Sequence, residues 1–219
     1  MIKKLSISTI VLFYLLSSSS LLGIECARCH MERKVKENIP QTNPIAIKDN
    51  GKIRSITLSD AFNYHGHSCP GVTTAFLAIR YGITLLYDKD IPDQKDLVIT
   101  SRTPAPGCMD MIDFLMINKK DEVKTSAPKG MKSGRDNFCF TIYSKSKAAA
   151  VDIQLKPEKY PEDFFILKKK QANNNMTEDE WQTMHDYMKG MILSFPLMSS
   201  EELFGKPGLY RVIIWGKLP

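Results

Sequence analysis

The longest amphipathic pattern of the chain covers residues 70–87. Its apolar positions recur at spacings of three and four, which predicts a helix with one buried face. These positions are Val72, Ala75, Phe76, Ile79, Ile83 and Leu86. Beside them runs a strip of small residues, made of Gly71, Ala75, Ala78 and Gly82. The strip would let another backbone approach closely, either in the core or in a homodimer.

Shorter patterns of hydrophobic and polar residues predict the other elements. Alternation and β-branched residues predict strands at 53–56, 96–100, 137–144, 149–155 and 209–215. Apolar spacing and helix-start signals predict helices at 57–65, 108–116, 161–171, from 177 onward, and at 199–204. This order of elements predicts one α+β domain, in which helices pack on a small mixed or antiparallel sheet.

The N-terminal segment has the three-part pattern of a secretory signal peptide. A basic start is followed by an apolar stretch at about 5–16 and then by small polar serines. We expect a signal peptide at 1–23, a tail and linker at 24–50, and the domain at 51–219. This organisation predicts an exported, periplasmic protein without stable membrane insertion after cleavage. The alternative is an uncleaved anchor over residues 5–24.

The bulk composition fits one domain of ordinary size plus extensions. The chain has 219 residues, 43% of them hydrophobic, and a formal charge of +6. Its lysines and arginines are spread over several short runs, without the aromatic signature of an RNA-binding surface. We therefore interpret the basic residues as solvated surface and expect no nucleic-acid partner.

The densest chemistry lies just before the long predicted helix. His65, His67 and Cys69 fall within five residues, and imidazole nitrogen and thiolate sulfur are the donors that zinc and similar metals prefer. One predicted helix ends at Gly66 and the next begins after Cys69, so the donors would converge between two helices. The helix N-terminus also favours the thiolate form of Cys69. A solvated turn with a buried thiol is the alternative.

A second cysteine occupies a similar position further along. Cys108 follows Pro106 and Gly107 at the start of a predicted helix, so we expect it to join the site as a fourth ligand. A disulfide between Cys69 and Cys108, or unrelated positions, are the alternatives. Cys139 lies within a predicted strand and is interpreted as a core thiol.

Residues 26–30, Cys-Ala-Arg-Cys-His, have the spacing of a covalent haem c attachment site. Cys26 and Cys29 would form the thioethers, and His30 would be the proximal iron ligand. A local disulfide, half of a zinc site and a disordered tail are the alternatives. A haem here would dock on the main domain or on a partner. Its distal ligand would be a methionine or His185, which is otherwise interpreted as packed or solvated.

Residues 65–71, His-Gly-His-Ser-Cys-Pro-Gly, together with the helix after them, resemble the FmdE family, which takes its name from formylmethanofuran dehydrogenase. A cysteine that opens a later helix, here Cys108, and a following strand pair are similar to further hallmarks, so that the resemblance covers about residues 52–205. The resemblance strengthens the expectation of metal binding. The family's acidic residue three places after the second cysteine has no counterpart here, because Asp110 is two places on and Asp113 five.

Three functions remain open from the sequence. The first is electron transfer between a haem c, the His/Cys site and a redox partner protein. The second is a zinc-dependent enzyme with an open coordination position. The third is a metal carrier or accessory protein without turnover. Residue spacing does not identify the metal or a substrate.

Overall fold

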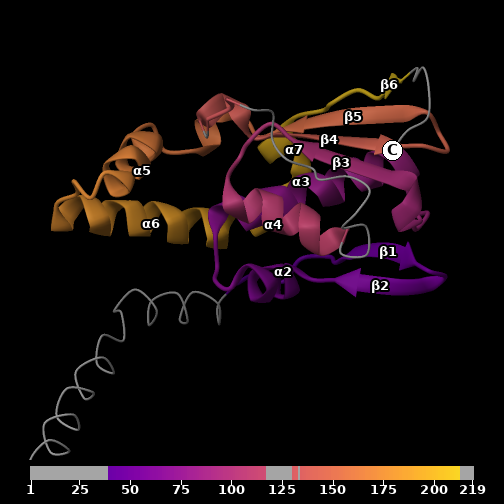
Figure 1. Ribbon diagram of the computed structural model, residues 1–219, viewed down its shortest axis with the longest axis horizontal. Coiled ribbons are helices and arrows are strands. Elements are labelled where there is room, and N and C mark those ends of the chain that lie inside the picture. The colour runs from indigo at the N-terminus through magenta and orange to yellow at the C-terminus, as the bar shows by residue number, and fades with distance from the viewer. Residues whose placement is uncertain (1–38, 117–129, 133, 213–219) are drawn as a thin grey trace, which may run out of the picture.

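The computed structural model describes residues 39–116, 130–132 and 134–212 (Figure 1). The predicted signal peptide and the Cys26–His30 motif lie outside these residues. Within them, six α-helices and two antiparallel sheets form one α+β domain, as the sequence pattern predicts. None of the described helices combines the length and the apolar character that a membrane crossing requires.

The described chain begins with a hairpin that the sequence pattern does not predict in full. Strand β1 (Ile45–Asp49) pairs with β2 (Lys52–Ile56) through a turn at Asn50 and Gly51, both with positive φ. The expectation of a linker through residue 50 is wrong for β1. Ile45 and Ile47 are 2% and 0% exposed, so burial of two isoleucines stabilises a strand in a segment of mainly polar composition.

The larger sheet has the strand order β3-β4-β5-β6, and every pair in it is antiparallel. Its strands are β3 (Leu97–Ser101), β4 (Cys139–Ser144), β5 (Ala149–Gln154) and β6 (Tyr210–Arg211). The predicted strand pair at 137–144 and 149–155 is therefore confirmed. The predicted last strand is represented by β6, an exposed two-residue edge strand, and residues 213–215 lie outside the described range.

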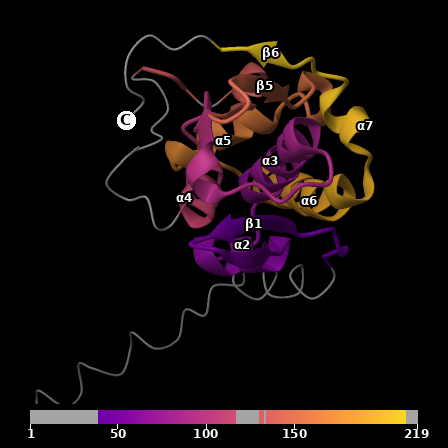
Figure 2. The same ribbon diagram turned by 90° about the vertical axis from the view of Figure 1, so that its right-hand side faces the viewer.

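Helix α3 (Pro70–Tyr87) forms the centre of the core. The sheet lies on one side of it and the β1–β2 hairpin with α2 (Leu58–His65) on the other (Figures 1 and 2). A Cβ added at Gly82 would come within 2.6 Å of Ile142 Cδ1 of β4. The strip of small residues on α3 therefore serves core packing against the sheet, and it offers no surface for a homodimer.

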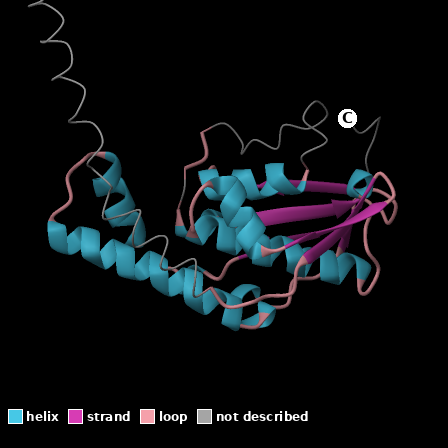
Figure 3. Ribbon diagram, turned by 90° about the horizontal axis from the view of Figure 1, so that it is seen from below, coloured by secondary structure: helices cyan, strands magenta, loops and turns pink. Residues whose placement is uncertain are grey.

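Three more helices complete the fold beyond α4 (Pro106–Leu115): α5 (Phe164–Ala172), α6 (Glu178–Ser194) and α7 (Ser200–Phe204). Helices α5 and α6 extend to one side, beyond the end of the sheet (Figure 3). The start of α6 agrees with the helix predicted from residue 177 onward, and a capping box of Thr177 and Glu180 forms it. On the apolar face of α6, Met184 and Met191 are buried, whereas Trp181 and Met188 are half-exposed.

Candidate metal centre

A sharp bend between α2 and α3 positions the candidate donors. Helix α2 starts with a capping box of Thr57 and Asp60 and stops after His65. Gly66 ends it in the left-handed conformation with φ 94°, where its N–H donates to the Phe62 carbonyl. Cys69 is extended and directly precedes Pro70, the first residue of α3. Local signals in the sequence thus dictate the bend.

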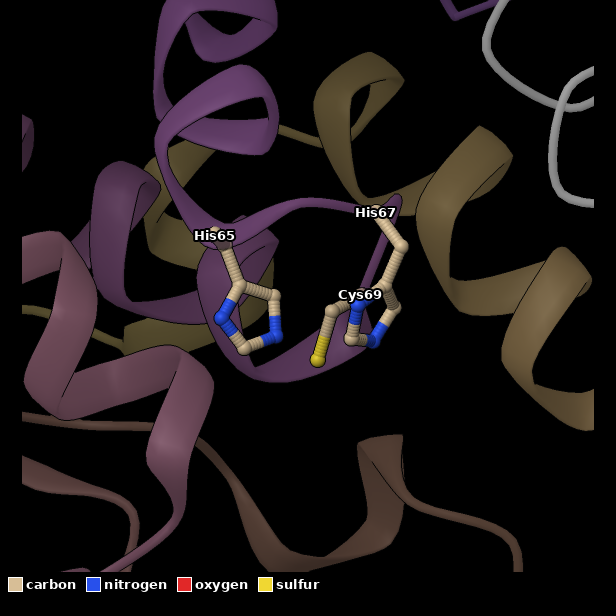
Figure 4. A group of neighbouring side chains, drawn as sticks. All are labelled: His65, His67 and Cys69. Carbon is tan, nitrogen blue, oxygen red and sulfur yellow. The ribbon is translucent and has the colours of Figure 1, made fainter.

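The bend brings His65, His67 and Cys69 together (Figure 4). Their ligand atoms all lie within 4.8 Å of one another, and the centroids of the two imidazole rings are 4.3 Å apart. Ligands of one tetrahedral zinc ion are roughly 3.5 Å apart, so small side-chain movements would close the three donors on an ion. The chemistry of this donor set, two imidazoles and one sulfur, fits zinc and similar borderline metals.

A carboxylate from another helix orients the first histidine. Nδ1 of His65 donates a hydrogen bond to Oδ2 of Asp110 on α4, with a distance of 2.6 Å. This contact holds the ring and leaves Nε2 as the nitrogen available to a metal, the usual arrangement of carboxylate, histidine and ion. The sequence pattern missed this role because it depends on the packing of α2 against α4. Asp113, one turn further along α4, is exposed.

The electrostatics of the cluster favour an ionised sulfur. Burial opposes ionisation of Cys69, but hydrogen bonds from His65 and His67 and from the Val72 backbone outweigh it and lower the thiol pKa from 9.0 to about 6. The contact with Cys69 raises the pKa of His65, burial opposes this rise, and Asp110 adds to it, so that the pKa moves from 6.5 to about 9. Without a metal, the pair is therefore a thiolate and an imidazolium near neutral pH.

The structure does not bring Cys108 into this group. Its Sγ is fully buried and donates to the Gly71 carbonyl at 3.3 Å. Burial, and next the charge of Cys69, raise the Cys108 pKa well above 9.0, so without a metal Cys108 is a protonated thiol, in contrast to Cys69. Cys108 also lies within the first turn of α4, after Pro106 and Gly107, which confirms its predicted position at the start of a helix. Both cysteines are free thiols, so the disulfide alternative is not formed here.

Glycines make room for the sulfur of Cys69 between the two helix starts. A Cβ added at Gly107 would lie 3.0 Å from Cys69 Sγ and 3.0 Å from the Val72 nitrogen. At Gly71 the added atom would lie 3.5 Å from Cys69 Sγ and 3.6 Å from Cys108 Sγ. Gly107 is therefore the tighter position, where any side chain displaces the sulfur or the α3 backbone.

The cluster faces a cavity of about 940 Å³. The bend and the start of α4 form its floor, and α5 and α6 form the opposite wall. His185 of α6 lines this wall, so the structure places it in the cavity rather than in the core. Cys139 is a buried free thiol of β4, which agrees with its interpretation as a core residue. The half-exposed Trp181 and Met188 also line the cavity, which explains why they are not part of the core.

Comparison with known proteins places this site in a family. No curated protein matches the chain. A family model described as FmdE, molybdenum formylmethanofuran dehydrogenase operon, matches residues 64–205. The match covers the bend, the helices that carry the cavity and three strands of the larger sheet, more than half of the sequence. The chain therefore belongs to the FmdE family.

Proposed function

We propose that this chain holds one transition-metal ion, zinc or a metal of similar preference, through His65 Nε2, His67 and Cys69 Sγ. The observation that carries the proposal is the grouping of these three ligand atoms within 4.8 Å, with Asp110 fixing the orientation of His65. Burial of the His65 side chain, which is 8% exposed, supports the same role. A buried histidine held by a carboxylate is costly to arrange in a merely solvated turn.

The cavity favours an enzyme over a structural metal site. Structural zinc sites close around the ion with four protein ligands, whereas catalytic sites keep one position for water or substrate. Here three donors share the floor of a cavity large enough for a small molecule. A bound ion would supply Lewis acidity at that position. The protein would orient the ligands through Asp110 and bind the substrate in the cavity.

Metal analysis of purified variants tests this proposal. We expect about one zinc per chain in the parent protein. Cys69→Ser removes a proposed ligand, so it should weaken zinc binding by more than 100-fold. Loss of a residue that only orients a ligand weakens metal binding 10–100-fold. Cys139→Ser, which removes a buried thiol of β4, is the matched control and should retain the metal. Full metal content in Cys69→Ser refutes the proposed ligand set.

Rapid metal exchange without turnover would instead favour a carrier or accessory protein. The off-rate of zinc, measured with excess chelator, separates this alternative from an enzyme.

Electron transfer through haem c remains a second candidate function. It is favoured by the position of His185, which lines the same cavity as the His/Cys cluster and is one of the distal ligands considered from the sequence, beside the methionines. The haem itself would be attached at Cys26, Cys29 and His30, outside the described residues. We propose export to the periplasm, where such attachment takes place. Expression with haem-attachment machinery should give a Soret band and a pigment that survives acid–acetone extraction, and a colourless protein refutes this candidate.

A further inference from the structure

One side of the cavity is aromatic and apolar. Phe138 and Tyr160 have ring centroids 4.7 Å apart, and Phe165 lies 5.2 Å from Tyr160. Phe164, Trp181, Met188 and Ile192 extend this wall along α5 and α6. Because the rings pack on one another, the wall is already formed before a ligand arrives.

The charged residues around the cavity are mostly basic. Four exposed lysines line it, namely Lys132, Lys168, Lys169 and Lys189. Among the described residues that line the cavity, Asp186 is the one carboxylate, and it accepts a hydrogen bond from Gln182. The arrangement attracts an anion, since low-dielectric walls strengthen the field of the lysines.

A buried hydroxyl lies beside the candidate ligands. Ser68, between His67 and Cys69, lines the cavity and is 7% exposed. Its Oγ has no hydrogen-bond partner among the residues that the structure describes. An unpaired buried hydroxyl is costly, which favours a ligand that supplies the missing partner.

From these observations we infer that the cavity takes an amphipathic organic acid: a carboxylate or similar acid on an aromatic or branched apolar body. The apolar body lies on the aromatic wall that includes Phe165, and the acid group faces Lys168 and Lys169 of α5. The part of the molecule nearest the floor reaches the metal and Ser68. A volume of about 940 Å³ suits a molecule of this kind and is far larger than an acetate or phosphate ion needs. This inference rests on the proposed function, since it names the substrate class of that site.

Calorimetric titration of zinc-loaded protein with three probes tests the inference. The probes are 4-phenylbutyrate, its neutral analogue 4-phenylbutanol, and butyrate, which lacks the ring. We expect 4-phenylbutyrate to bind about tenfold more tightly than either of the others, because it alone matches both the wall and the lysines. Added NaCl should weaken binding of the acid and leave the alcohol unchanged.

Paired variants assign the charge effect to the cavity. Replacing Lys168 and Lys169 together by Gln should weaken 4-phenylbutyrate binding by about three- to tenfold and leave 4-phenylbutanol unchanged. Lys52→Gln with Lys95→Gln removes the same charge from exposed positions that do not line the cavity, and it should change neither affinity. Met188→Ala should weaken both phenyl probes alike, since it trims the apolar wall.

The outcomes separate this inference from the proposed metal site. If the protein holds zinc but binds the three probes equally, or if the two lysine pairs behave alike, the inference is overturned and the metal site stands. If the protein holds no zinc but keeps the probe order and its dependence on Lys168 and Lys169, the metal site is overturned and the acid site stands. A dimer seen by sedimentation, in which a second copy excludes all three probes, also overturns the inference.

Discussion

Substitution of Asp110 by Asn tests the link between the helix packing and the chemistry of the cluster. The change keeps the shape of the side chain but removes the charge that accepts the 2.6 Å hydrogen bond from His65. A hydrogen bond to a charged group contributes about 1.5–3 kcal/mol. The Asp110 side chain is 40% exposed, so solvent screening reduces this value to about 1–1.5 kcal/mol. We therefore expect zinc affinity to fall roughly tenfold, at the lower end of the 10–100-fold range for such partners.

The pH dependence gives this prediction a signature that a structural effect would not produce. Zinc must displace the proton of His65, whose pKa of about 9 is raised first by Cys69 and then by Asp110. In the parent protein, affinity should rise with pH until the pH passes that pKa. In Asp110→Asn the pKa of His65 moves down, so the proton competes less near pH 7. Relative to the parent protein, Asp110→Asn should therefore lose the full tenfold in zinc affinity above pH 9 and less than that at pH 7.

Competition with a chromophoric chelator from pH 6.5 to 9.5 measures this profile. Asp113→Asn on the same helix removes the same charge from an exposed position and is the control. Two results would refute the reasoning: parent-like affinity of Asp110→Asn at every pH, or an equal effect of the two substitutions.

Three further predictions follow from the same geometry. Gly107→Ala should destabilise the fold by about 1–3 kcal/mol and weaken metal binding. Gly190→Ala is the control, because an added Cβ there meets nothing within 4 Å, and it should stabilise α6. Equal urea denaturation midpoints for Gly107→Ala and Gly190→Ala would contradict the prediction. In metal-free protein, iodoacetamide should modify Cys69 with a midpoint near pH 6, and zinc should block the reaction; modification at Cys108 instead would be contrary evidence. Thr177→Ala should cost about 0.5–2 kcal/mol in urea denaturation, whereas Thr183→Ala in mid-helix should cost less.

The parts of the fold that the sequence predicts are those set by neighbouring residues. The capping boxes at Thr57 and Thr177 and the left-handed Gly66 depend on contacts within a few positions, and all three are present. The bend of the candidate site follows from them. Strand β1 is not predicted because its stability comes from burial of Ile45 and Ile47 against distant residues.

The parts of the site that the sequence does not predict depend on packing between distant elements. The similar positions of Cys69 and Cys108 after a loop suggest a shared site, but the approach of α4 to α3 turns Cys108 towards the Gly71 carbonyl. The same approach brings Asp110 to His65. The cavity requires α5 and α6 to lie opposite the bend, and their amphipathic patterns carry no information on that placement.

A last prediction separates metal binding from a different use of the same groups. Sulfur, imidazole and carboxylate in the order Cys69, His65, Asp110 also describe a thiol nucleophile activated by a histidine. A nucleophile of this kind needs one imidazole, whereas a metal site gains a ligand from the second, His67. We therefore expect His67→Ala to weaken zinc binding more than 100-fold, beyond the range for an orienting partner, while iodoacetamide still modifies Cys69 at a rate within a few-fold of the parent. Unchanged zinc affinity in His67→Ala would favour the nucleophile and remove His67 from the ligand set.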